Sequence, residues 1–255
     1  MFFGHGEKIK DFKKLVDKGR LGHAYLFFGD AGIGKFLFAK LLANYLESSE
    51  FAISSVPLID AAFFSPDEKG TIGIPAVREI RNFLRQTPLK SPRRLAVIDN
   101  VEALTPEAQS ALLKIVEEPP SHALIIFIGH DEQVIFAPLL SRLNKIYFSR
   151  FSESEIKKIL QEHYDLSAAK AETVAKESFG RLGRAIDIIK GGSENPMTLE
   201  AELEGKILEL WQKNPFKNSK KLAWMLERES LIKRFDLNKN LQRRAIEEKL
   251  HEQSN

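Results

Sequence analysis

The chain of 255 residues contains no cysteine. Without thiols it cannot form a disulfide bond, a thiolate nucleophile or a zinc site built on sulfur. Histidine is also scarce, with 6 residues and no H-E-x-x-H or comparable spacing among them. We therefore expect no bound zinc and no structural metal.

Long hydrophobic runs are absent as well. No stretch reaches the ~18 apolar residues that a membrane-spanning helix needs, and the N-terminal MFFGHGEKIK lacks the regions of a signal peptide. The charge is nearly balanced, with 38 Lys and Arg against 35 Asp and Glu and a net charge of +3. This balance argues against a strongly basic nucleic-acid-binding domain. Together these features predict a cytoplasmic globular protein with no membrane partner.

Apolar residues make up 43% of the chain, which is enough for a substantial core. Over residues 1–150, short apolar runs alternate with amphipathic segments, a pattern typical of an α/β domain with a parallel sheet. Runs such as AYLFF and ALIIFI are continuously apolar, as in strands covered on both faces. We expect strands at His23–Phe28, near Pro57–Phe64, at Leu95–Asp99, at Ala123–Gly129 and at Lys145–Phe148.

Beyond residue 150 the pattern becomes helical. Ser152 and Glu155 fit a capping box, Ser167 fits an N-cap, and the pair Gly191-Gly192 is expected to end a third helix. A GGSENP stretch then predicts a linker before further helix. The predicted organisation is a parallel-sheet domain over 1–150, a three-helix module over 151–192 and a short all-helical region over 193–255.

The segment GDAGIGKF, directly after the first predicted strand, has the G-x-x-x-x-G-K spacing of a phosphate-binding loop. Its glycines let consecutive backbone N–H groups converge on a phosphate, and the following helix adds its positive N-terminal dipole. The candidate residues are Gly29, Gly32, Gly34 and Lys35. The alternative is a glycine-rich strand-to-helix turn that holds no ligand.

Two positions that hydrolysis requires are altered. The residue after Lys35 should carry the hydroxyl that ligates Mg²⁺, but it is Phe36. The strand LAVID ends at Asp99, where a metal-side carboxylate belongs, yet Asn100 follows in place of an acid that could activate water. These losses indicate an ATPase scaffold that no longer hydrolyses ATP. Asp99 could alternatively cap a turn, and Glu102 could replace the missing base.

The motifs GRLGHAYLF, GDAGIGK, LAVIDNVEAL, ALLKIVEEPP, SRLNKIYF and GRLGRAI occur in this order. The series resembles clamp-loader ATPases of the AAA+ superfamily, most closely the delta prime subunits of bacterial DNA polymerase III, over about residues 3–190. The resemblance implies a P-loop AAA+ core of RecA type, a three-helix lid and a C-terminal region that corresponds to the family's helical collar.

The resemblance also suggests roles for two arginines. Arg142 matches the arginine of the family's Ser-Arg-Cys motif, which reaches ATP bound on the neighbouring subunit; the alternative is an arginine paired with a local carboxylate. Arg184 matches the second sensor in the lid, which can approach nucleotide in the same chain or serve domain packing. Leu143 replaces the motif's third residue and leaves the guanidinium intact. His130, near the first sensor position, is given no role.

By this resemblance the chain is a non-hydrolysing stator subunit of the clamp loader, a component of a DNA-directed DNA polymerase holoenzyme. It supports ATP-driven loading of the sliding clamp onto primed DNA and donates Arg142 to a neighbouring ATPase. The implied partners are gamma/tau-type ATPase subunits and the delta subunit, with the sliding clamp and primed DNA reached through the complex. Many delta prime relatives carry a four-cysteine zinc module, whereas the corresponding NYLESSEFAISSV has no cysteine.

Two other functions remain open on the sequence. One is an active P-loop ATPase of the helicase-loader or branch-migration kind with unusual metal ligation. The other is a module that holds ATP or ADP as a structural ligand without metal, which is compatible with the stator function. The stator function itself requires no cofactor.

Overall fold

The computed structural model describes residues 3–190, 199–234 and 239–251. The chain falls into two compact units, Met1–Ile186 and Asp187–Asn255. The boundary between the units lies within helix α8 (Leu182–Ile189). This helix ends just before the predicted stop at Gly191-Gly192, and that glycine pair and the predicted GGSENP linker lie outside the described residues.

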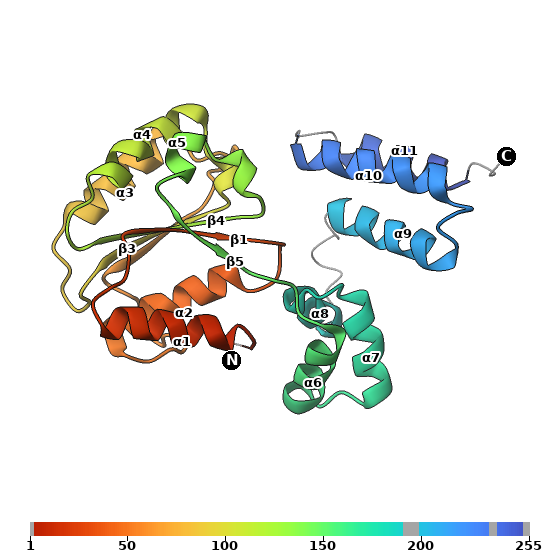
Figure 1. Ribbon diagram of the computed structural model, residues 1–255, viewed down its shortest axis with the longest axis horizontal. Coiled ribbons are helices and arrows are strands. Elements are labelled where there is room, and N and C mark those ends of the chain that lie inside the picture. Colours follow the sequence, from red (N-terminus) through yellow and green to blue (C-terminus); the bar gives the residue numbers. More distant parts are fainter. Residues whose placement is uncertain (1–2, 191–198, 235–238, 252–255) are drawn as a thin grey trace. The chain divides into compact units, whose positions relative to one another are not determined.

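The first unit is built on a five-stranded parallel sheet with the strand order β2-β3-β4-β1-β5 (Figure 1). The strands are β1 (Ala24–Phe28), β2 (Ala61–Phe64), β3 (Arg94–Asp99), β4 (Ala123–Gly129) and β5 (Asn144–Tyr147). The prediction of a parallel α/β sheet is confirmed. Four predicted strands are confirmed to within one residue at either end.

The second predicted strand was placed too early. It was expected from Pro57, but β2 begins only at Ala61. Proline has no N–H to give to a neighbouring strand, and the Asp60 N–H donates to Glu47 Oε1 at 2.7 Å rather than to the sheet. Residues 57–60 therefore belong to an irregular segment that leads into the strand.

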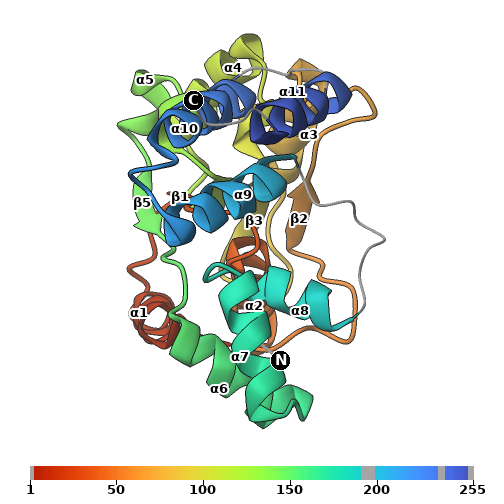
Figure 2. The same cartoon turned by 90° about the vertical axis from the view of Figure 1, so that its right-hand side faces the viewer.

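Side chains alternate between the two faces of the sheet, and each face has its own helical cover (Figures 1 and 2). Phe27 and the other strand side chains on the same face of the sheet pack with α1 (Gly6–Asp17) and α2 (Lys35–Ser48). Leu26 and the strand side chains on the opposite face pack with α3 (Ile74–Arg85), α4 (Pro106–Glu117) and α5 (Ala137–Leu140). Because both faces are covered, strands such as β4 are apolar throughout.

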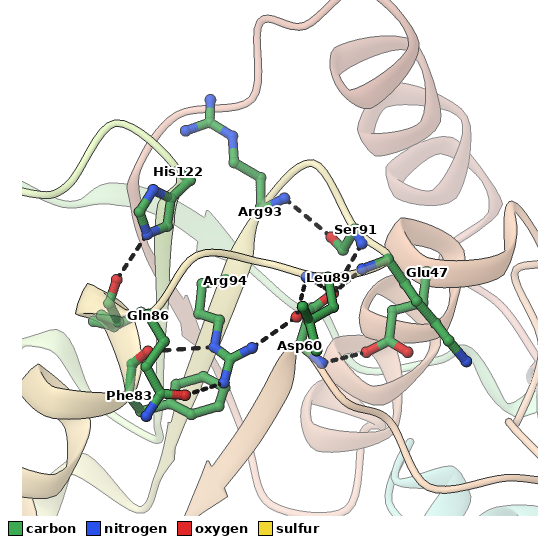
Figure 3. Close-up of polar contacts among 11 residues, drawn as sticks. Glu47, Asp60, Phe83, Gln86, Leu89, Ser91, Arg93, Arg94 and His122 are labelled. Atoms are coloured by element: carbon green, nitrogen blue, oxygen red, sulfur yellow. Dashed lines mark hydrogen bonds and ion pairs between the residues drawn. The ribbon is translucent and has the colours of Figure 1, made fainter.

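A buried ion pair joins the starts of β2 and β3 (Figure 3). Asp60 is 1% exposed, and its carboxylate accepts hydrogen bonds from the backbone N–H groups of Leu89, Lys90 and Ser91. Arg94 Nη1 completes the set at 2.7 Å from Asp60 Oδ1. The Arg94 side chain is thus buried and paired inside the core.

Three helices follow the sheet and complete the first unit: α6 (Glu153–Tyr164), α7 (Ala168–Glu177) and the start of α8. The predicted capping box is confirmed, because the Ser152 N–H donates to Glu155 Oε2 and the Glu155 N–H donates to Ser152 Oγ. The predicted cap at Ser167 is confirmed by its contact with the Lys170 N–H.

In the second unit the described residues form α9 (Leu199–Lys213), α10 (Ser219–Arg234) and α11 (Lys239–His251). Their apolar faces share a small buried cluster, Leu199, Leu203, Met225 and Ile246. Among the helices that the structure describes, none combines the length and apolar character that crossing a membrane requires.

Candidate functional site

The glycine-rich loop runs from the end of β1 to the start of α2, as its motif requires. Gly29, Gly32 and Gly34 have φ angles of 132°, 73° and 98°, a region that residues with a Cβ rarely adopt. A Cβ on Gly29 would also collide with the backbone oxygen of Phe148. The glycines are therefore needed for the loop's shape whether or not it holds a ligand.

Lys35 points back into this loop. Its Nζ donates to the carbonyl oxygens of Gly29 and Asp30, at 2.5 and 2.6 Å, and the residue is only 6% exposed. Burial lowers the pKa of Lys35 to about 8, although the carboxylates of Glu102, Asp30 and Asp99 favour its charged form. The ammonium that would face a phosphate is thus bonded to the loop's own backbone.

Helices α6 to α8, which correspond to the predicted three-helix lid, contact the loop directly through the backbone. The Gly183 N–H, in the first turn of α8, donates to the carbonyl oxygen of Gly32 at 2.7 Å. A Cβ on Gly183 would approach that oxygen to 2.8 Å, closer than normal packing allows. Glycine at this position therefore permits the contact between lid and loop.

Two side chains hold the loop from other directions. Arg150, just before the lid, pairs with the Asp30 carboxylate through Nε at 2.6 Å and Nη2 at 3.1 Å. His5 Nε2 lies 3.0 Å from the Ile33 carbonyl oxygen, which can only accept, so this nitrogen carries the proton. Burial lowers the pKa of His5. The loop is thus fixed by the N-terminal segment, the lid and the connection between sheet and lid.

A cavity of about 520 Å³ lies beside the loop. Loop residues 31–37 line it together with residues from the ends of β3 and β4 and from α8, among them Asp99, Gly129 and Ile186. Phe3 closes one wall, and its ring lies 4.5 Å from that of His163 in the lid. This is the place where a nucleotide would bind in a phosphate-loop protein.

Phe36, at the position where a metal ligand would be expected, packs against neighbouring side chains. Its ring meets that of Phe63 edge-on at 5.6 Å, and Lys40 Nζ lies 4.5 Å above its centre. A phenyl ring supplies no oxygen ligand for Mg²⁺. Within the described residues no group of three or more His, Asp or Glu side chains is placed to hold a metal ion.

We expect Phe36→Thr to leave the chain unable to hydrolyse ATP, because Asn100 still offers no general base. The variant should also lose about 1–3 kcal/mol of unfolding free energy, since it gives up the aromatic contact with Phe63. Urea unfolding and a steady-state ATP assay measure the two effects, and Phe36→Leu serves as the apolar control. A gain of Mg²⁺-dependent hydrolysis would contradict this account of the site.

At the end of β3, Asn100 occupies the position where the motif would place a second acid, and it has a structural role. Asn100 adopts φ 62° and begins the short 3₁₀ helix Val101–Ala103; asparagine tolerates this left-handed conformation better than most residues. Burial raises the pKa of Asp99. Glu102, the alternative base, accepts hydrogen bonds from the N–H groups of His130 and Asp131. Its carboxylate therefore fixes the end of β4.

Arg142 follows α5 and does not line the cavity. Its Nη2 pairs with Glu117 Oε1 at 2.7 Å, and its Nη1 donates to the carbonyl oxygen of Pro138 at 2.6 Å. The side chain stays 40% exposed. The pairing with a local carboxylate, one of the two sequence alternatives, is thus present, and the guanidinium remains accessible from outside.

Gln109, for which the sequence predicted no role, is 5% exposed in the middle of α4. Its Nε2 donates to the Val134 carbonyl oxygen and its Oε1 accepts from the Phe136 N–H, at 3.2 and 2.8 Å. It thereby fixes the segment that leads into α5 and Arg142. A signal was available, because Gln109 shares helical spacing with the buried Leu112 and Val116.

Arg184 lies in α8, which contributes Leu182, Gly183 and Ile186 to the cavity wall. Its guanidinium lies 4.7 Å from the ring centre of Phe179 in a cation–π contact. The structure thus gathers Gly32, Gly34, Lys35, Phe36 and the end of β3 around one cavity, and it places Gly29, Arg142 and Arg184 outside that lining.

The family model described as "DNA polymerase III, delta subunit" matches residues 4–152. The gamma/tau subunit of DNA polymerase III from Mycoplasma pneumoniae is 29% identical over 201 residues, covering 72% of this chain and 28% of that protein. The gamma subunit from Buchnera aphidicola is 29% identical over 189 residues, covering 68% and 52%. The chain therefore spans about a quarter to a half of the length of these curated relatives.

Solved structures agree on the fold. A gamma-subunit-related protein from Thermotoga maritima superposes with a TM-score of 0.55 at 18% identity, covering 93% of this chain and 96% of that one. The RuvB Holliday junction branch migration motor of the same organism gives 0.53 at 20% identity, covering 74% and 61%. These likenesses show that the fold is shared with those structures. The match over residues 4–152 places the chain in the DNA polymerase III delta subunit family.

Proposed function

We propose that the chain is a non-hydrolysing stator of the delta prime kind within a bacterial clamp loader. It would support loading of the sliding clamp onto primed DNA by donating Arg142 to ATP held by a neighbouring gamma/tau-type subunit. The observation that carries the proposal is the combination of an intact phosphate-loop fold with Phe36 and Asn100 at the two hydrolytic positions. The family match supports it.

The geometry disfavours the alternative of an active ATPase. Glu102 would have to act as the base, but its Oε1 is already held by two backbone N–H groups beyond β4. Glu102 lines the cavity, but with Oε1 held in this way only its Oε2 could take a proton from a water molecule. The resemblance to RuvB concerns the fold and gives no reason to assign its motor activity here.

The loop keeps part of what nucleotide binding needs. Gly29, Gly32 and Gly34 supply the curled backbone, and Lys35 supplies a cation that must first leave two carbonyl oxygens. These residues would hold ATP or ADP as a structural ligand without metal. Arg184 would stabilise the packing of the lid through its cation–π contact with Phe179. We propose neither zinc nor Mg²⁺ for this chain.

The partners follow from the same proposal. Gamma/tau-type ATPase subunits and a delta subunit would contact this chain directly, and the sliding clamp and primed DNA would be reached through the complex. The second unit, whose described residues form α9 to α11, would then correspond to the family's helical collar.

The purified chain should show no Mg²⁺-dependent ATP hydrolysis above background, with or without primed DNA. The reason is that Phe36 gives the metal no oxygen and Asn100 gives water no base. Steady-state phosphate release measures this, with Lys35→Ala as the control for contaminating activity. Turnover that Lys35→Ala abolishes would make the chain an enzyme and remove the stator proposal.

A further inference from the structure

The contact between Arg142 and Glu117 has a specific geometry. The ion pair measures 2.7 Å from Nη2 to Oε1, and Glu117 is the last residue of α4. The Pro138 carbonyl oxygen and the Ser141 hydroxyl oxygen accept from Nη1 of the same guanidinium, at 2.6 and 3.4 Å. The side chain is therefore held from two directions, by the end of α4 and by α5.

These contacts leave donors for a second ligand. A guanidinium carries five N–H groups, and the three contacts involve Nη1 and Nη2 only. In the part of the chain that the structure describes, nothing accepts from Nε. Glu117 and Arg142 are 45% and 40% exposed, so the remaining N–H groups can meet a phosphate brought by another protein.

We propose that Glu117 is the positioning residue for Arg142: it orders the guanidinium before the neighbouring subunit presents its ATP. This inference rests on the proposed function. A free arginine side chain loses considerable rotamer entropy when it binds. A side chain already fixed at one edge loses less, so the arginine is in place when charge develops on the γ-phosphate.

The expected size of the effect is modest, because the pair is exposed. Exposed ion pairs shift populations by about two- to fivefold. Glu117→Ala should therefore lower the kcat of the neighbouring ATPase by about two- to fivefold in the reconstituted loader, with KM nearly unchanged. Glu117→Gln keeps an acceptor oxygen and should fall between Glu117→Ala and the wild type.

The adjacent Glu118 offers a matched control. It is also exposed and acidic, and it lies one residue beyond α4. Glu118→Ala should leave turnover unchanged, and gel filtration should show the same assembled complex for all variants. In the Arg142→Ala background, Glu117→Ala should have no further effect, because a positioning residue acts only through the group that it positions.

The outcomes separate this inference from the proposed function. If Arg142→Ala lowers turnover but Glu117→Ala does not, Glu117 has no positioning role and the stator proposal stands. If Glu117→Ala raises turnover, Glu117 competes with the phosphate and the inference is wrong. If Arg142→Ala itself changes nothing, the proposed function and this inference are both overturned.

Discussion

Replacing Arg142 by alanine should lower ATP turnover at the neighbouring active site by about 10³-fold or more. Arginines supplied in trans to a γ-phosphate are worth about 10³–10⁵ in rate in GTPases, because the guanidinium neutralises charge that grows in the transition state. Arg142 can act in this way because its side chain is 40% exposed beyond α5 and is held by Glu117 and Pro138.

The measurement must isolate one site, since a loader with several ATPase subunits dilutes the loss at any of them. A reconstituted complex in which only the subunit beside this chain keeps its own phosphate-loop lysine meets this need. Single-turnover hydrolysis on primed DNA then reports the chemical step. Turnover within about twofold of wild type would show that Arg142 does not reach the nucleotide.

Two controls separate chemistry from folding. Arg142→Lys keeps the charge but loses the planar fork of donors, so it should recover only a small part of the rate. Arg142→Ala removes one exposed ion pair, which contributes about 1 kcal/mol or less to stability. Its urea midpoint should therefore stay close to that of the wild type.

Much of the fold could be predicted because local chemistry and global packing agree. Apolar runs predicted β1, β3 and β4. The predicted caps at Ser152 and Ser167 also form, the first with its predicted partner Glu155. The start of β2 was placed too early because an apolar run does not show which acceptors its backbone N–H groups will bond. The Asp60 N–H turns to Glu47, which is 13 residues earlier in the chain.

The candidate site likewise has a part that the sequence predicts and a part that it does not. The loop glycines and Phe36 could be recognised because motif spacing fixes their neighbours. Contacts between distant segments could not be recognised: those of Gly183 with Gly32 and of His5 with Ile33. A carboxylate partner for Arg142 was one alternative, but its identity as Glu117 could not be predicted. Such pairings depend on the tertiary structure, and no local period in the sequence encodes them.

Replacing Asp60 by asparagine should cost about 3–5 kcal/mol of unfolding free energy, the loss expected when one member of a buried ion pair is removed. Arg94 would keep its charge at 6% exposure without its carboxylate. The new amide nitrogen would also face N–H donors of Leu89, Lys90 and Ser91 (Figure 3). Urea unfolding of the full chain measures the loss.

Asp67→Asn is the matched control. Asp67 also accepts hydrogen bonds from backbone N–H groups, those of Lys69 and Thr71, but it lies in an exposed turn. Its replacement should leave the urea midpoint nearly unchanged. A loss as large for Asp67→Asn as for Asp60→Asn would mean that burial beside Arg94 is not the cause.

The cost of Asp60→Asn should depend on pH in a defined direction. Burial alone would raise the pKa of Asp60, but the N–H groups of residues 89–91 and the Arg94 guanidinium outweigh it and hold the pKa below its ordinary value of 3.8. The stabilisation is therefore complete above pH 3.8 and is lost as pH falls through the folded-state pKa. The difference in unfolding free energy between the wild type and Asp60→Asn should shrink over that acidic range. A difference that stays constant on acidification would show that the charge of Asp60 contributes nothing, leaving only the shape and hydrogen bonds of its side chain.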